Sequence, residues 1–228
     1  VNNAGITRDK SLGKMSDVAN TGRTVLFVSH NMPAINRLCS QAILLDKGRL
    51  IASGSSEEVT EKYLRGTTED RGARQWEIES APGTEQVRLV GVRLFSDDGS
   101  YKTVFDVSEN IYLQMLYQVN VPATTFRCAA IFNTQGVVAF TSVEPFEMKR
   151  VETGLYSSIL KIPSNLFSEN EYIVQVSAFS SAGGKYHYFR IKNVINFQIY
   201  DSMKQNSARG DYVQNLAGVV RPILDWDT

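Results

Sequence analysis

The segment IYLQMLYQVN, residues 111–120, decides the fold of this 228-residue chain, because its side chains alternate more regularly than those of any other stretch. In a β-strand, successive side chains point to opposite faces of the sheet. One face of this segment carries Ile111, Leu113, Met115, Tyr117 and Val119, and the other carries Tyr112, Gln114, Gln118 and Asn120. The pattern predicts a β-strand that buries its first face and exposes its second.

Less regular alternating runs lie on both sides of this segment. They cover residues 87–94, 103–107, 126–132, 137–142, 156–162, 172–178 and 186–200, with Gly, Asn, Asp and Ser between them. Eight or nine short strands with almost no helical periodicity predict a mainly β fold, an immunoglobulin-like or jelly-roll β-sandwich over residues 84–228. The late pair Arg221-Pro222 predicts an edge strand, since proline has no N–H to donate, and such an edge offers a dimer contact.

The stretch before the sandwich, residues 24–58, has a different pattern. The apolar run at residues 25–28 predicts a strand covered on both faces, as in a parallel sheet flanked by helices, and it ends in Ser29 and His30. A helix is predicted over residues 31–39, followed by a strand at 42–45 and a turn at 46–48. Ser55 and Glu58 have the spacing of a capping box, which predicts the start of a second helix.

This order of elements resembles the end of the ATPase domain of ABC transporters, over about residues 22–66. In that family a strand ends in Ser-His, and a helix, a strand of the L-L-D-x-G-R type and an x-x-G-x-x-E-E-V helix follow; here these are residues 25–30, 31–39, 43–49 and 54–59. We assign residues 21–66 to an incomplete α/β fragment of such a domain. The resemblance implies that His30 is the switch histidine, which contacts the γ-phosphate of ATP. The alternative is that His30 only closes a buried strand.

Other ABC ATPase motifs are absent from this sequence. It contains neither a G-x-x-x-x-G-K-[ST] loop to wrap the phosphates nor an L-S-G-G-Q signature, and a working domain also needs a carboxylate to hold Mg²⁺. In an intact protein these groups would precede Thr24. We expect this chain neither to bind ATP tightly nor to hydrolyse it alone. The resemblance implies ATP and Mg²⁺ as cofactors of the intact parent, and none for this chain.

Residues 1–20 contain a segment, VNNAG, that resembles short-chain dehydrogenases. That family also needs a glycine-rich cofactor loop and a Tyr-x-x-x-Lys pair on a helix. The pair Tyr188 and Lys192 has this spacing, but it lies in a predicted strand. We interpret residues 1–20 as a stray segment, with a fragment of an oxidoreductase as the alternative. Residues 67–83 are small and charged and are predicted to be a linker, although Trp76 and Ile78 suit the start of a strand.

Composition excludes several function classes. Lys plus Arg and Asp plus Glu both number 24, so no global charge favours nucleic acid. The two cysteines, Cys39 and Cys128, have no metal-ligand spacing and are predicted to be buried thiols in a reducing compartment. No apolar run approaches the ~20 residues that span a bilayer, and no signal peptide opens the sequence. These features predict a soluble, cytoplasmic protein.

An ABC ATPase end joined to a β-sandwich resembles the ATP-binding subunit of Wzt-type exporters, which move lipid-linked O-antigen polysaccharide. The segments FDVSE, residues 105–109, and GVVRP, residues 218–222, add to the resemblance. It implies a sandwich that recognises the polysaccharide, a transmembrane permease as partner, a homodimer, and a location on the cytoplasmic face of the bacterial inner membrane. The alternative is a docking or dimerisation module that binds no glycan.

Glycan sites combine aromatic faces, which contact the C–H faces of sugars, with planar polar groups that bind hydroxyls. The polar side of the predicted sheet suggests a carbohydrate-binding set of eight residues from three strands: Tyr112, Gln114 and Gln118, then Gln175 and Ser177, then Tyr186, Tyr188 and Arg190. Each is also an ordinary sheet residue. Tyr186 or Tyr188 belongs to the core if His187 and Phe189 face outward instead.

Catalysis by the sandwich is the competing hypothesis. A glycosidase needs two carboxylates about 5–10 Å apart. The available acids, Asp97, Asp98, Asp106, Glu109, Glu144 and Glu147, fall mostly in predicted turns without an evident pair. His187 is the sandwich's one candidate base, no Gly-x-Ser-x-Gly motif occurs, and no metal-ligand spacing is present. We therefore do not expect an enzyme.

Overall fold

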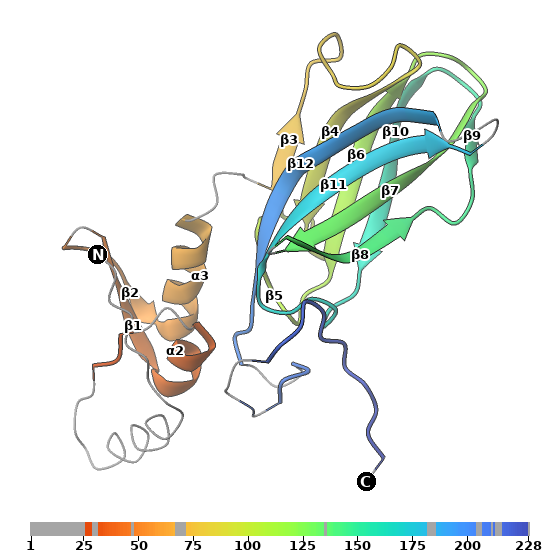
Figure 1. Ribbon diagram of the computed structural model, residues 1–228. Helices are drawn as coiled ribbons and strands as arrows, with labels where there is room; N and C mark the ends of the chain where they lie inside the picture. Colours follow the sequence, from red (N-terminus) through yellow and green to blue (C-terminus); the bar gives the residue numbers. More distant parts are fainter. Residues whose placement is uncertain are drawn as a thin grey trace.

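The computed structural model describes residues 26–28, 32–46, 48–66, 72–134, 136–181, 186–203, 207–210, 212 and 216–227. These residues form a small α/β part and a larger β-sandwich (Figure 1). The prediction of a mainly β sandwich preceded by an α/β fragment is confirmed.

The sandwich consists of two sheets. The first sheet has the strand order β10-β6-β4-β3 and is antiparallel throughout. The second sheet has the order β5-β12-β11-β7-β8, in which β5 runs parallel to β12, and a short strand, β9, pairs with the start of β7. The first sheet contains β3 (Ala73–Gln75), β4 (Val87–Phe95), β6 (Ile111–Val119) and β10 (Gly154–Ile162). The second contains β5 (Val104–Asp106), β7 (Thr124–Thr134), β8 (Val137–Val143), β9 (Met148–Arg150), β11 (Glu171–Ser180) and β12 (Tyr186–Tyr200).

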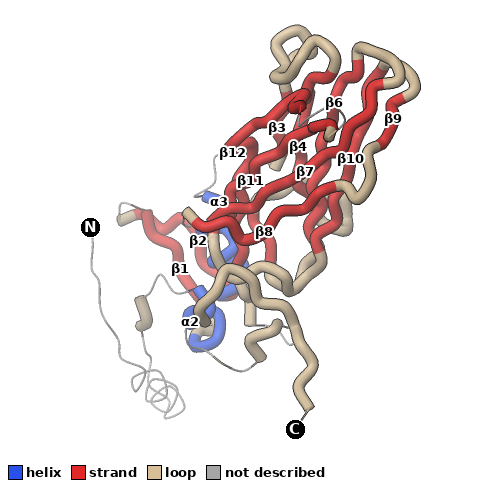
Figure 2. Tube along the Cα trace, turned by 45° about the vertical axis from the view of Figure 1, so that its right-hand side comes forward, coloured by secondary structure: helices blue, strands red, loops and turns tan. Residues whose placement is uncertain are grey.

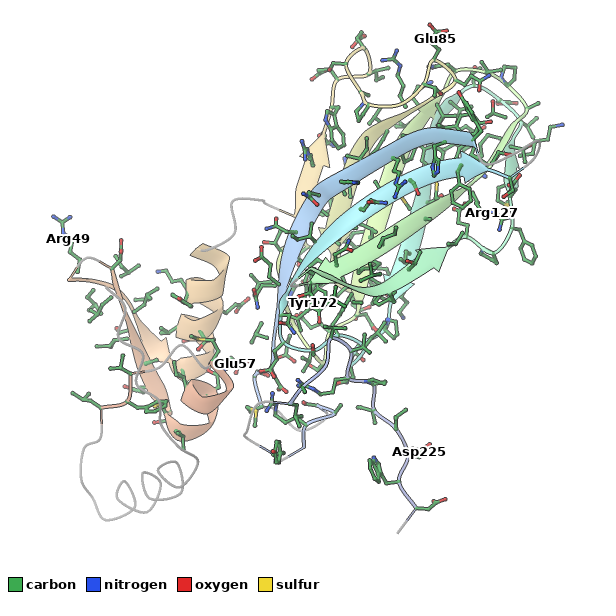
Figure 3. All side chains as sticks on the ribbon, in the orientation of Figure 1. Arg49, Glu57, Glu85, Arg127, Tyr172 and Asp225 are labelled. Carbon is green, nitrogen blue, oxygen red and sulfur yellow. The ribbon has the colours of Figure 1, made fainter. Side chains whose placement is uncertain are left out.

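The core lies between the two sheets and is rich in aromatic side chains (Figure 3). Phe132, Phe167, Tyr172 and Phe197 contact one another with ring centroids 4.3–6.3 Å apart, in edge-to-face, tilted and stacked arrangements. Each such buried ring contributes about 1.5–3 kcal/mol through the removal of apolar surface from water. On β6, the five apolar residues from Ile111 to Val119 are buried and the four between them are half-buried, as the alternation predicts.

The β12 strand bends strongly near its middle. Val174 of β11 pairs with Ile195 and Val176 pairs with Ile191, so three residues of β12 oppose one residue of β11. Asn193, inside this bulge, has φ 51°, a conformation that asparagine tolerates better than most residues. Arg74 of β3 donates a hydrogen bond to the carbonyl of Val194, 3.4 Å away. The bulge thereby joins the edges of the two sheets.

The FDVSE segment forms a clamp at the end of β5. Asp106 accepts hydrogen bonds from the backbone N–H groups of Ser108 (2.9 Å) and Ser202 (2.8 Å). Glu109 accepts the N–H of Asp106 at 2.7 Å and forms an ion pair with Lys102. The two acids therefore hold the chain where β5 and β12 end, which is a structural task.

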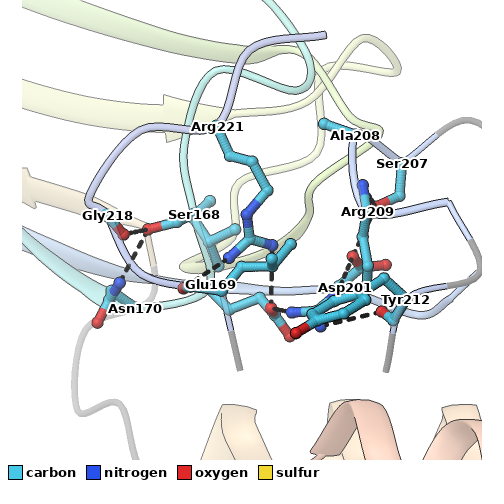
Figure 4. A network of polar contacts seen from close by, with 12 residues as sticks. Ser168, Glu169, Asn170, Asp201, Ser207, Ala208, Arg209, Tyr212, Gly218 and Arg221 are labelled. Atoms are coloured by element: carbon cyan, nitrogen blue, oxygen red, sulfur yellow. Dashed lines mark hydrogen bonds and ion pairs between the residues drawn. The ribbon is translucent and has the colours of Figure 1, made fainter. Parts of the chain in front are cut away.

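The C-terminal segment is fastened to the residues before β11 (Figure 4). Ser168 donates to the carbonyl of Gly218 (2.8 Å), Tyr172 donates to that of Val219 (2.7 Å), and Arg221 donates to Glu169 (3.1 Å). The predicted edge strand at Arg221-Pro222 is wrong: residues 216–227 form one isolated bridge, Phe167 with Val220, and no strand. Side-chain anchors and two backbone hydrogen bonds hold the segment without a regular strand; the backbone bonds run from the Arg221 N–H to the Leu166 carbonyl (2.9 Å) and from the Ser168 N–H to the Val219 carbonyl (3.5 Å).

The sandwich begins earlier than the sequence indicated. Residues 72–83 were assigned to the linker, but Ala73–Gln75 pairs with β4 and Trp76 packs against the core. Ile78 lies in an exposed turn. At this boundary the backbone of Gly72 lies close to the backbone of Lys102. Gly72 has φ 76°, and a Cβ there would lie 2.5 Å from the backbone nitrogen of Lys102. The short strands β3 and β9 are too brief to show alternation.

The α/β part contains α2 (Met32–Leu38), β1 (Gln41–Asp46), β2 (Arg49–Ser55) and α3 (Ser56–Gly66). The predicted capping box is confirmed, because Ser55 Oγ accepts the N–H of Glu58 and Glu58 accepts the N–H of Ser55, both at 3.3 Å. The predicted covered strand is wrong for residues 26–28, which form no strand. Leu26 and Val28 are exposed, and no described strand pairs with them.

The described helices, blue in Figure 2, belong to the α/β part, and this part contacts the sandwich where β5 and β12 end. Met32 of α2 packs against Val104 and Tyr200 of the sandwich. Burial and nearby carboxylates, including Asp106 and Glu61, raise the pKa of Tyr200 above its usual range. This junction therefore keeps the tyrosine neutral.

Candidate functional site

The structure does not bring the eight predicted carbohydrate-binding residues into one place. β6 belongs to the first sheet, whereas β11 and β12 belong to the second. Tyr112, Gln114 and Gln118 therefore lie on the outer face of one sheet, opposite in the sandwich to the other five. Strand pairing separates them, and pairing between distant segments was not evident from the sequence.

The β11 residues of the set have little exposed surface. Gln175 is 9% exposed and Ser177 is 6% exposed, although both alternate with core residues and so lie on the outer side of the second sheet. Ala129 and Ile131 flank them on β7, and Ser177 pairs with Arg190 on β12. Of these three candidates only Arg190 is exposed. They offer one accessible cation and no aromatic face.

Tyr186 and Tyr188 stand at the far end of the sandwich. A register shift between Ala178 and Phe179 leaves Tyr188 between the paired residues Phe189 and His187. Tyr188 packs on Phe126 of the core at 5.3 Å between ring centroids, and Tyr186 meets Tyr188 edge-on at 5.1 Å. Phe189 is buried as well, so the irregularity directs two consecutive aromatic side chains to the core.

Tyr112 lies within a row of side chains on the outer face of the first sheet. We call Arg93, Phe95, Tyr101, Tyr112 and Lys161 the aromatic row. The rings of Phe95 and Tyr112 stack at 5.1 Å with an interplanar angle of 11°, and Tyr101 meets Phe95 edge-on at 6.4 Å. The Arg93 guanidinium lies 5.4 Å from the Tyr101 ring centroid, and the Lys161 amine lies 5.7 Å from that of Tyr112. Three rings are thus bounded by two cations.

Strand register produces this row. Lys161 of β10 pairs with Tyr112 of β6, which pairs with Phe95 of β4. Tyr101 joins because the chain turns back after β4 and forms an isolated bridge with Phe95. Asp98 holds the turn, accepting hydrogen bonds from the Ser96 hydroxyl (2.7 Å) and from the N–H of Ser100 (2.9 Å). The turn presents Tyr101 with 51% of its surface exposed.

Asp97 fixes the polar end of the row. It accepts hydrogen bonds from the Tyr112 hydroxyl (2.8 Å) and from the Asn110 amide (3.0 Å). These bonds lower the pKa of Asp97, so it is an ionised acceptor at neutral pH. Tyr112 has one ring face against Phe95 and the other below Lys161, and its hydroxyl is engaged. Tyr101 is consequently the most exposed ring of the row, with the Arg93 guanidinium over one of its faces.

Sequence reasoning identified Tyr112 but missed Arg93, Phe95, Tyr101 and Lys161. Their neighbourhood depends on which strands pair and in which register, and neither property is encoded within a short window. The one local signal was the Asp97-Asp98-Gly99-Ser100 turn, which brings the chain back beside β4.

The acids weighed for catalysis have structural hydrogen bonds. Glu144 accepts from the Ser158 hydroxyl (2.5 Å) and from the N–H of Cys128 (2.9 Å). Glu147 accepts from the N–H of Ser181 (2.6 Å), which lowers its pKa. Within the described ranges, no group of three or more His, Cys, Asp or Glu side chains has a metal-binding arrangement. The predicted nucleotide contact, His30, lies outside the described residues.

Comparisons with known proteins support the fold and the resemblance found in the sequence. The sandwich has the fold of the crystallised C-terminal domain of Wzt: the two align with a TM-score of 0.52 over 70% of this chain and 92% of that one, at 10% identity. No family model matches the chain. Sequence relatives are ATP-binding proteins of cell-surface polymer export, which confirms the resemblance found in the sequence.

The particular relatives include the O-antigen export system ATP-binding protein RfbB of Myxococcus xanthus, 29% identical over 129 residues, which are 50% of this chain and 30% of that protein. The teichoic acids export ATP-binding protein TagH of Lactococcus lactis is 42% identical over 55 residues, 24% of this chain and 12% of the relative. An RfbB of Klebsiella pneumoniae is 37% identical over 54 residues, covering 24% and 22%. The chain thus spans at most 30% of the length of these relatives.

Proposed function

We propose that this chain is the C-terminal part of the ATP-binding subunit of a polysaccharide exporter, and that its sandwich recognises the exported glycan. The observation that carries the proposal is the aromatic row, with its exposed Tyr101 ring beside charged and amide side chains. The fold of the Wzt domain and the names of the relatives support the same reading.

The row has the chemistry that a sugar requires. The C–H face of a pyranose fits against the exposed Tyr101 ring, which removes apolar surface from water on both partners. Asp97 and Gln114 accept hydrogen bonds from hydroxyl groups, and Arg93 donates them. Since Asp97 is already held by Tyr112 and Asn110, it is oriented before a ligand arrives, and little side-chain entropy is lost on binding.

The wider role follows from the parent protein. We propose that the parent binds ATP and Mg²⁺, that His30 contacts the nucleotide there, and that this chain alone does not hydrolyse ATP because its sequence lacks a phosphate-binding loop. The partners are a transmembrane permease and the polysaccharide, at the cytoplasmic face of the inner membrane. The helices that the structure describes are all too short or too polar to cross a bilayer.

Dimerisation without glycan binding is a second candidate function, and β10 favours it. Among the described strands, β10 pairs only with β6, so its other edge carries unpaired backbone groups. Leu155 and Ile159 project from it with 62% and 55% of their surface exposed. A long apolar edge strand is a template for pairing with a second copy. Light scattering of the purified chain measures this directly: a dimer that survives dilution supports the module, and a monomer speaks against it.

The test of glycan recognition is binding of the purified chain to a panel of bacterial surface polysaccharides, with ATP turnover followed in the same samples. We expect saturable binding without turnover. Tyr101→Ala should weaken binding about tenfold, equivalent to ~1.4 kcal/mol, through loss of the stacking surface. Arg190→Ala, on the other sheet, should leave it unchanged. If Arg190→Ala weakens binding and Tyr101→Ala does not, the site is on the second sheet. ATP turnover would contradict the proposal on hydrolysis.

A further inference from the structure

The outer face of the first sheet carries an uneven charge. The outward positions of β4, β6 and β10, which alternate with buried ones, include three cations, Arg88, Arg93 and Lys161, and no carboxylate. The whole chain, in contrast, has equal numbers of basic and acidic residues, 24 of each. The excess of cations is therefore a property of this face and not of the composition.

Within the described part of the chain, none of these three cations takes part in a salt bridge. Lys161 attracts Asp97 at longer range, and its charge helps to lower the pKa of that carboxyl. Arg88 donates to the carbonyls of Glu79 (2.8 Å) and Ala81 (3.4 Å), and Arg93 donates Nη1 to the Tyr101 hydroxyl at 3.1 Å. All of these acceptors are uncharged. The charge of each guanidinium consequently remains available to an anion.

Arg93 is the half-buried cation that lies closest to the rings of the row. Its Nη1 donates to the Tyr101 hydroxyl, and its Nε is shielded from solvent, so an anion would reach the guanidinium at its terminal nitrogens. Carboxylate and phosphate groups suit these donors, because a guanidinium binds such groups through two parallel N–H···O bonds. Arg93 lies beside the exposed ring of Tyr101, so an anion there would belong to a ligand already stacked on the row.

Two acids lie in the turn at the other end of the row, and both are occupied. Asp97 is bound by Tyr112 and Asn110, and Asp98 by Ser96 and Ser100. Along β4, Arg88 precedes Arg93 by five residues, about 16 Å in an extended strand, and the bulge between Leu89 and Gly91 puts both on the outer face. A linear polymer that runs along β4 meets both.

We propose that the aromatic row binds an acidic glycan, in which a sugar stacked on Tyr101 bears a carboxylate or phosphate that pairs with Arg93. The inference rests on the proposed glycan recognition and adds the charge class of the glycan. Lys161 and Arg88 strengthen the attraction for a polymer with repeated anions, and dissolved salt weakens it.

The experiment uses the same panel of bacterial polysaccharides, divided into polymers with uronate, polymers with phosphate, and neutral ones. Each acidic polymer that binds is compared with its own neutral form, made by carboxyl reduction of the uronates or by removal of the phosphates. We expect the acidic polymers to bind, the neutralised forms to bind at least tenfold more weakly, and the affinity to fall as NaCl rises. The two treatments distinguish carboxylate from phosphate as the recognised group.

Substitutions distinguish the effect of a lost charge from the effect of a lost fold. Arg93→Gln should reduce binding of the acidic polymer about tenfold, and Arg93→Lys should keep part of the affinity because it keeps the charge without the two-pronged geometry. Lys192→Gln, which removes an exposed cation from β12 on the other sheet, is the matched control and should have no effect. Thermal melting verifies that each variant is folded.

The outcomes distinguish the two proposals. If neutral polysaccharides bind as tightly as acidic ones, the acidic inference is wrong while glycan recognition stands. If no polysaccharide binds, both are wrong. Vesicles of phosphatidylglycerol are the last probe: if they bind through Arg93 and the polysaccharides do not, the face recognises an anionic membrane surface, which overturns the inference.

Discussion

Single side chains decide how firmly the C-terminal segment is held. Arg209 is buried to 2% exposure of its side chain and forms ion pairs with Asp201, itself 1% exposed, and with Glu169 (Figure 4). Glu169 also binds Arg221, so two arginines share one carboxylate. A buried pair contributes modest net stability, but the loss of one partner leaves the other charge buried and unpaired.

We predict that Arg209→Met lowers the free energy of unfolding by about 3–5 kcal/mol, because Asp201 and Glu169 lose their common cation. Urea denaturation measures the change. Arg190→Met, at an exposed position of β12, is the control and should shift stability by less than about 0.5 kcal/mol. Equal stability of the two variants would mean that the buried network does not hold this region.

Cys128 is a second residue whose behaviour follows from its surroundings. It is 1% exposed, and burial raises the pKa of its thiol to about 12. The thiolate is the reactive form, so the folded protein at pH 8 holds almost none of it. In a Cys39→Ser background, we predict that iodoacetamide labels Cys128 only after denaturation. Labelling of the native protein at the rate of a free thiol would show that the two sheets open at this point.

For single residues, the sequence predicted the types of side chain at the site better than it predicted the contacts between them. The alternation of β6 correctly placed Tyr112 on the outer face of the sheet, yet it carried no information on which side chains cover the two faces of its ring. These are covered by Phe95 and Lys161, which lie 17 residues before and 49 residues after Tyr112 in the sequence. Tyr101 falls in a turn with no periodicity, and only the return of the chain beside β4 places it in the row.

Among the elements, β3 defines where the sandwich begins. Its first bond is made by Gly72, whose carbonyl accepts the N–H of Leu94 at 2.7 Å. Gly72 and Gly99 share nearly the same left-handed conformation, with φ of 76° and 79°. A Cβ on Gly72 would collide with the backbone of Lys102, whereas a Cβ on Gly99 would meet nothing within 4 Å. Both glycines therefore carry the cost of a left-handed backbone, whereas only Gly72 adds the cost of a steric collision.

We predict that Gly99→Ala costs about 1–2 kcal/mol, from the left-handed backbone alone. Gly72→Ala should cost roughly 1–3 kcal/mol more, because the added methyl collides with the backbone of Lys102, which must move. Chemical denaturation of both variants gives the comparison. If they are equally stable, residues 72–75 are not held against the sandwich, and the original assignment of this segment to the linker is right.

Strand positions were predictable because alternation is local, and eight of the predicted runs coincide with β4, β5, β6, β7, β8, β10, β11 and β12. The partition of these strands between two sheets was not predictable, because pairing joins segments far apart. The predicted eight-residue site combined β6 with β11 and β12, and the sandwich places these strands in different sheets. The wrong edge strand at Arg221 has a similar cause: side-chain anchors and two backbone bonds to Leu166 and Ser168 hold that segment, and these partners lie far away in the sequence.

Across the whole molecule, the two parts differ in how well they bury their apolar residues. The main core is built entirely from residues of the sandwich. In the α/β part, Ile43, Leu45, Leu50 and Ile51 of the β1–β2 hairpin are all exposed, and Arg49 extends from its tip (Figure 3). A fragment of an α/β domain leaves such faces uncovered, as the resemblance to the end of an ABC ATPase predicts.

We predict that a fragment of residues 72–228 folds alone, since the core does not depend on the α/β part. It should melt cooperatively within a few degrees of the full chain, a difference of about 1 kcal/mol or less. Circular dichroism during heating measures this. A fragment without a cooperative transition would show that the α/β part completes the sandwich, and the junction of Met32 with Val104 and Tyr200 would then be the place to look.

The most direct measurement of the central claim is amide NMR mapping of the polysaccharide that binds from the panel. Our account predicts that the shifted signals cluster at Arg93, Phe95, Tyr101, Tyr112 and Lys161, and that Tyr101→Ala raises about tenfold the glycan concentration needed to produce these shifts. Shifts confined to β11 and β12 would contradict this account, because they would place the glycan on the opposite face of the sandwich.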